Sequence, residues 1–132
     1  MTQMSKYTKK NVDWVITTFM NSFIAVEPKL KKSQLTLSAT GDDLNLGSLD
    51  WMDVITELEG AFNITIETRG LFGSNVRKLL YACTRTLINQ NRLTYAEETI
   101  IVQEYDNMVK AMNIVQKAQP ASIATVVKQN TK

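Results

Sequence analysis

Histidine is absent from this chain of 132 residues, and cysteine occurs once, as Cys83. Without histidine the protein cannot build a Ser-His-Asp or Cys-His catalytic arrangement, and it lacks the commonest zinc ligand. A single cysteine excludes an internal disulfide, which fits a reducing compartment. Only carboxylates or lysines remain as candidates for catalysis, and their arrangement does not favour it. We therefore expect a protein that is not an enzyme and holds no metal.

Phosphate-binding loops and long apolar runs are missing as well. Neither GxxxxGK[ST] nor GxGxxG occurs, so nucleotide binding has no support. No apolar run approaches the length of a membrane span, and the lysine-rich residues 1–11 lack the apolar core of a signal peptide. The length fits one domain. We expect a single cytoplasmic, monomeric domain over residues 1–118, with no membrane span.

The formal net charge of +2 conceals a segregation of charge along the chain. Residues 68–96 carry five basic side chains and no acidic one. Segregated charge bears on partners rather than on fold. Nucleic acid is not an expected partner, because aromatic residues do not alternate with the basic ones and the preceding segment is acidic. That segment, residues 33–68, has no lysine or arginine but contains Asp42, Asp43, Asp50, Asp53, Glu57, Glu59 and Glu67.

Apolar residues recur at helical spacing in several stretches, and no stretch predicts a convincing strand. The expected fold is therefore an all-α small helical bundle. The buried face of the second helix should carry Val54, Leu58 and Phe62. The expected helices span residues 9–24, 49–61, 75–88 and 96–117.

Three features define the segments outside these helices. Residues 29–47 are expected to form a long ordered loop, in which leucines contact the core. Ser74 or Asn75 should cap the third helix. Pro120 should end the last helix and leave residues 119–132 as a flexible C-terminal tail.

Three short motifs mark the second helix: one at its start, one near its end and one just after it. They are Gly47-Ser48-Leu49-Asp50, Leu58-Glu59, and Phe62 with Ile64-Thr65-Ile66. This arrangement resembles the prosthetic-group segment of acyl carrier proteins, where an Asp-Ser-Leu motif opens the helix. The likeness covers residues 12–66 and is dense from 42 to 66. It implies a bundle of four helices.

The resemblance also implies that Ser48 carries a 4'-phosphopantetheine arm, donated by coenzyme A, whose thiol holds an acyl chain as a thioester. Its phosphate would lie near backbone N–H donors and the positive end of the helix dipole. The implied function is that of a carrier in fatty acid, polyketide or another specialised biosynthesis. The implied partners are a phosphopantetheinyl transferase and the enzymes that load and process the acyl group. They would dock on Leu49, Asp50, Met52, Asp53, Glu57 and Glu59.

The chain departs from the family pattern at three places, and at one of them Thr56 stands where the family has a methionine-like partner contact. Gly47 stands where the family has the aspartate that helps the transferase recognise the serine. Residues 69–94 are expected to be an insertion that adds one helix before the last one. This insertion could fold over the bundle and form a second, basic contact surface, in which case removing residues 70–94 should spare the fold.

Simpler interpretations stand beside these. Ser48 would serve equally well as a helix N-cap, whose hydroxyl accepts from a first-turn N–H. The chain could also keep the carrier fold without the arm and act as a protein-interaction module. Trp51 is expected to pack in the core, Met52 could pack or contact a partner, and Cys83 should be a buried apolar residue. Catalysis by the carboxylates of Asp42 and Asp43 is not favoured.

Overall fold

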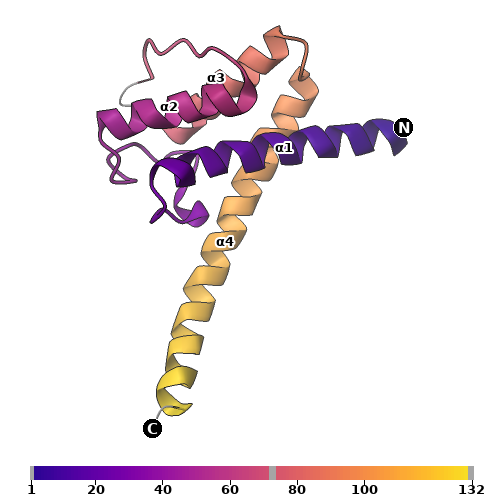
Figure 1. Cartoon of the computed structure of the whole chain (residues 1–132). Helices are drawn as coiled ribbons and strands as arrows, with labels where there is room; N and C mark the ends of the chain where they lie inside the picture. Colours follow the sequence, from indigo (N-terminus) through magenta and orange to yellow (C-terminus); the bar gives the residue numbers. More distant parts are fainter. Residues whose placement is uncertain (1, 72–73, 131–132) are drawn as a thin grey trace.

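The computed structural model describes the backbone of residues 2–71 and 74–130 and the side chains of residues 9–71 and 74–115. The expected all-α bundle is confirmed, because the described backbone contains helices and one isolated antiparallel bridge between Thr40 and Asn75 (Figure 1). The helices are α1 (Thr2–Val26), a short 3-10 helix η1 (Lys32–Gln34), α2 (Ser48–Phe62), α3 (Val76–Asn89) and α4 (Tyr95–Asn130).

The long loop between α1 and α2 is ordered by the core, as expected. Its five leucines are all buried. The loop is also held from α4, because the buried Tyr105 hydroxyl donates to the Leu35 carbonyl at 2.7 Å. The segment that leads to Ser48 is therefore fixed at several points. The five leucines are Leu30, Leu35, Leu37, Leu44 and Leu46.

Helix α3 is part of the core and not an addition on top of it. It begins after Asn75, whose side chain caps it by accepting from the Lys78 N–H at 3.0 Å, as expected. Its apolar face is fully buried, so we now expect that removing residues 70–94 would disrupt the fold and not spare it. Whether the segment is an insertion relative to the family stays a prediction. The fully buried residues are Val76, Leu79, Leu80, Cys83 and Leu87.

Helix α4 is longer than the sequence suggested. Its backbone remains helical through Pro120 as far as Asn130, so the predicted end near residue 117 was wrong. The φ angle of proline suits a helical backbone even though its ring removes one helical hydrogen bond. The flexibility of residues 119–132 stays a prediction. Figure 1 shows the C-terminal part of α4 extending well beyond the other helices.

Two carboxylates join the start of α4 to α1 and α3. Glu97 accepts from the Asn11 side chain of α1 at 2.6 Å. Glu98 accepts from the Thr84 hydroxyl of α3 at 2.6 Å and pairs with Arg85 at 2.8 Å. In the part of the chain that the structure describes, no helix has the length and apolar character needed to cross a bilayer.

Candidate functional site

Ser48 lies at the first position of α2 and is exposed. The predicted helix start is right to within one residue, but Ser48 is not the N-cap, because that position is occupied by Gly47. The Asp50 carboxylate accepts from the Gly47 N–H at 3.4 Å, and none of the described side chains accepts from the first turn in the manner of an N-cap. The Ser48 hydroxyl is therefore not committed to capping the helix.

The loop before Ser48 is a tight turn. The Leu46 N–H donates to the Gly41 carbonyl at 2.8 Å, and Asn45 between them adopts a left-handed backbone with a φ of 60°. A Cβ at Gly41 would lie 2.8 Å from the Leu46 carbonyl oxygen, so glycine is required there. Thr40 and Asp43 exchange hydrogen bonds of 3.0 and 3.2 Å between backbone N–H groups and side chains. This turn holds the approach to α2 in one conformation.

A cleft of about 350 Å³ opens beside Ser48, and we call it the serine cleft. Trp51 forms one wall of it and is 3 % exposed, so its predicted packing role is confirmed. The indole N–H donates to the Leu71 carbonyl at 3.1 Å, which joins α2 to the segment before α3. The serine cleft is lined by Thr40, Gly41, Asp42, Leu46, Gly47, Ser48 and Trp51.

Most of the residues predicted to dock partners are exposed on α2. Leu49 is 81 % exposed and Met52 is 42 % exposed, so two apolar side chains of α2 face outward. Three acidic residues on the same helix are also exposed: Asp50, Asp53 and Glu57. An apolar contact within an acidic surface has the composition of a docking site, although docking itself stays a prediction.

Glu59 differs from the other acidic residues of α2. Its side chain is partly buried, and its carboxylate accepts from the Ile66 N–H at 2.9 Å. Between these two residues the chain leaves the helix through Asn63, which has a φ of 56°. Glu59 therefore holds the segment after α2 against the bundle. Sequence reasoning assigned it to docking and missed this role, which depends on a contact seven residues away.

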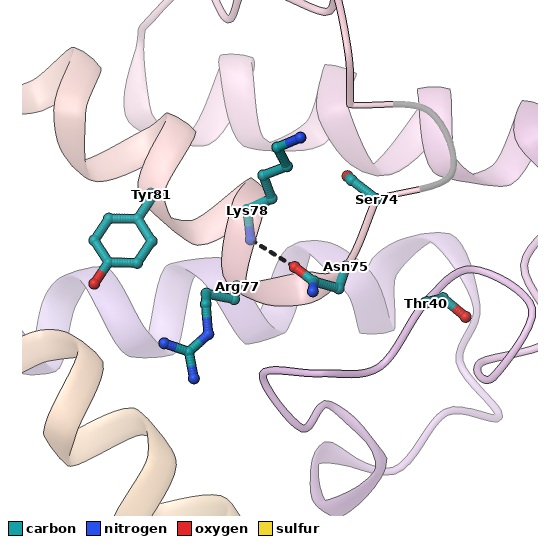
Figure 2. A pocket seen from close by; sticks show the side chains of 6 residues that line it. All are labelled: Thr40, Ser74, Asn75, Arg77, Lys78 and Tyr81. Carbon is teal, nitrogen blue, oxygen red and sulfur yellow. Dashed lines mark hydrogen bonds between the residues drawn. The ribbon is translucent and has the colours of Figure 1, made fainter.

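A second cleft, of about 440 Å³, lies at the start of α3, and we call it the basic cleft. Figure 2 shows Arg77 and Lys78 extending to opposite sides of the first turn of α3, with Tyr81 one turn further along. In the sequence, the adjacent basic residues Arg77 and Lys78 indicate this site. The sequence does not show where they lie relative to Ser48. The basic cleft is lined by Thr40, Ser74, Asn75, Arg77, Lys78 and Tyr81.

The comparisons with known proteins found partial matches to acyl carrier proteins, the family that the motif at Ser48 resembles. An acyl carrier protein of Streptococcus pneumoniae serotype 4 is 54 % identical over 35 residues, which is 26 % of this chain and 47 % of that protein. An acyl carrier protein of Streptococcus pyogenes serotype M1 is 43 % identical over 49 residues, which is 37 % of this chain and 66 % of that protein. This chain is similar to acyl carrier proteins over part of its length.

The similarity has clear bounds. The matched region spans about half to two thirds of the length of these curated relatives. No protein-family model matches the chain, and no solved structure matches it. Among the described residues, no group of three or more acidic or cysteine side chains is arranged to hold a metal ion.

Proposed function

We propose that this protein is an acyl carrier whose 4'-phosphopantetheine arm is attached to Ser48. The observation that supports the proposal is that the first turn of α2 has no capping side chain. Gly47 supplies no capping side chain, so the N–H donors of Ser48, Leu49 and Asp50 have no capping acceptor among the described side chains. A phosphate on the Ser48 oxygen would lie against these donors and at the positive end of the helix dipole.

The serine itself is suited to modification. It is exposed, it borders a cleft, and the tight turn before it fixes its position. In the attachment reaction the Ser48 oxygen forms a phosphodiester with the pantetheine phosphate of coenzyme A, and the nucleotide part of coenzyme A leaves. The transferase supplies the catalysis, so the carrier needs no catalytic residue of its own. The arm then carries an acyl group as a thioester on its thiol.

The exposed face of α2 supports the proposed partners. Acidic side chains around an apolar centre favour fast, reversible association with basic surfaces, which suits a carrier that visits several enzymes in turn. Leu49 and Met52 would supply the apolar contacts, and Asp50, Asp53 and Glu57 the charge. The partners would be a phosphopantetheinyl transferase and acyl-loading and acyl-processing enzymes in a biosynthetic pathway such as fatty acid or polyketide synthesis. We propose that the carrier acts as a cytoplasmic monomer.

The test is modification by a broad-specificity phosphopantetheinyl transferase with coenzyme A, followed by intact mass. We expect a gain of one arm that is lost in Ser48→Ala and retained in Ser38→Ala, a matched control at another exposed serine of the described chain. Gly47→Asp restores the aspartate of the family motif, and nothing lies within 4 Å of the position of the new Cβ, so we expect faster modification without strain.

Gly47 is also the observation that favours the alternative, a carrier fold used as an interaction module without an arm. In that case neither the wild-type protein nor Gly47→Asp would gain mass with any transferase tried, including those of the host. That result would refute the carrier proposal. The exposed face of α2 would then remain as the functional surface.

A further inference from the structure

Where α4 leaves the bundle, part of its apolar surface stays exposed. Ile114 is 69 % exposed and Val115 is 48 % exposed. A groove of about 530 Å³ lies here, where α4 passes η1, and we call it the α4 groove. Figure 1 shows the rest of α4 extending away from the other helices, so the groove opens outward. The α4 groove is lined by Lys32, Met108, Ala111, Met112 and Val115.

The two sides of the α4 groove are fixed to one another. The Asn113 side chain of α4 donates to the Ser33 carbonyl of η1 at 3.0 Å and to the Val109 carbonyl at 3.1 Å. The Tyr105 hydroxyl bond to the loop lies two turns earlier on α4. The apolar surface is therefore a preformed part of the bundle.

The η1 side of the α4 groove is basic. Lys32 lines the groove, and Lys29 and Lys31 come just before it in the chain. All three lysines are exposed, and none of them forms an ion pair with a described residue. An apolar groove beside unpaired lysines fits a partner surface that is both apolar and anionic.

The same charge continues along α4. Asp106, which pairs with Lys110 at 2.8 Å, is the last acidic residue of the sequence, and residues 107–132 contain four lysines. The backbone stays helical as far as Asn130. A lysine-bearing helix with an exposed apolar face is typical of helices that lie in a membrane interface, where the lysine stems extend to the headgroups.

Two other occupants fit the α4 groove less well. The same segment of a second copy carries the same positive charge and would be repelled. An acidic protein surface is best bound by arginine, because a guanidinium pairs with a carboxylate through two parallel hydrogen bonds. Residues 27–32 and 107–132 contain lysine and no arginine. Lysine suits mobile lipid headgroups, since its point charge needs no fixed geometry.

We propose that the α4 groove and the helix beyond it bind the surface of a bilayer that contains anionic lipids. The apolar side chains enter the interface, and the lysines of η1 and α4 contact the headgroups. This inference goes beyond the proposed function, because the contact needs neither Ser48 nor an arm. An acyl carrier bound in this way would deliver its cargo at the lipid surface.

The test measures how much protein sediments with vesicles of phosphatidylcholine alone or of phosphatidylcholine mixed with phosphatidylserine. We expect binding to the mixed vesicles and much weaker binding to phosphatidylcholine alone. Added salt should release the protein, because it screens the attraction between lysines and anionic headgroups. Ser48→Ala should bind as the wild-type protein does.

One pair of substitutions tests the apolar contact. Ile114→Gln with Val115→Gln should lower the binding at least about tenfold, because two apolar side chains no longer enter the interface. Both positions are exposed, so the fold should be retained. Leu49→Gln with Met52→Gln, a pair of similar exposure on α2, should leave vesicle binding unchanged.

A second pair tests the charge. Lys29→Gln with Lys32→Gln should lower the binding about 25-fold, since each lysine near an anionic surface contributes about fivefold. Lys9→Gln with Lys10→Gln, at exposed lysines of α1, changes the net charge equally and should bind nearly as the wild-type protein does. An equal loss in the two pairs would overturn the inference, because binding would then depend on net charge alone.

Other outcomes would overturn the inference as well. A protein that does not bind the mixed vesicles would leave an acidic protein surface as the occupant of the groove. A wild-type dimer in lipid-free solution that Ile114→Gln with Val115→Gln dissociates would assign the groove to a second copy. A protein that binds the vesicles but accepts no arm would refute the proposed function and support this inference.

Discussion

Replacing Leu79 by alanine tests whether α3 is an integral part of the fold. Leu79 is fully buried on the inner face of the helix. Removing a buried leucine side chain to the β-carbon costs about 2–5 kcal/mol, because apolar burial is lost and a cavity remains. Alanine favours helix at least as well as leucine, so the loss reports packing and not helix propensity. The change is a large part of a total stability of about 5–15 kcal/mol.

Urea unfolding followed by circular dichroism measures this loss. The matched control is Lys78→Ala, an exposed position on the same helix, where we expect a change of no more than about 0.5 kcal/mol. Deletion of residues 70–94 removes all of the buried face of α3 and should leave a chain without cooperative unfolding. The reasoning is refuted if Leu79→Ala costs less than about 1 kcal/mol, the size expected for a peripheral site.

Two further substitutions test buried polar contacts. Glu59→Ala should cost about 1–2 kcal/mol, because the Ile66 N–H loses its acceptor, whereas Glu57→Ala should leave stability unchanged in the same urea assay. If the two variants are equally stable, the hydrogen bond from the Ile66 N–H to Glu59 does not stabilise the fold. Burial raises the pKa of Tyr105 above its ordinary value of 10.0, so its stabilising contribution is complete below pH 10 and falls as pH rises further. Tyr105→Phe should lose about 1–2 kcal/mol of stability at neutral pH, since the Leu35 carbonyl is left unpaired. The stability of this variant should fall less steeply in alkali than that of the wild-type protein. Parallel pH profiles of the two proteins would contradict this.

Local patterns were enough to predict much of the fold. The spacing of Val54, Leu58 and Phe62 defined both the extent and the buried face of α2, and all three are buried. Asn75 identified the start of α3 because N-capping depends on one side chain and a neighbouring N–H. The leucines of the loop before α2 were recognised as core residues for their hydrophobicity alone. Each of these predictions depends on residues close together in the chain.

The end of α4 was misjudged from the local signal of Pro120. Other features that the sequence did not predict depend on contacts between distant residues. The packing of α3 into the core could not be read from its amphipathic pattern, which fits a helix on the surface of the bundle equally well. The contact of Glu59 with Ile66 requires the reversal of the chain at Asn63. The basic cleft depends on the pairing of Thr40 with Asn75, which are separated by 35 positions in the sequence. Sequence spacing alone does not fix contacts of this kind.

The burial of Cys83 has a practical consequence for chemical labelling. The thiol is fully buried, and burial, with the nearby Glu59 carboxylate, raises its pKa, so the folded protein holds it in the unreactive protonated form. As Cys83 is the one cysteine of the chain, a thiol reagent added to the native protein would find no accessible target unless an arm is attached. Alkylation of the native protein would then count the arms whose thiol is free, since a thiol held in a thioester does not react, and alkylation after unfolding would add Cys83.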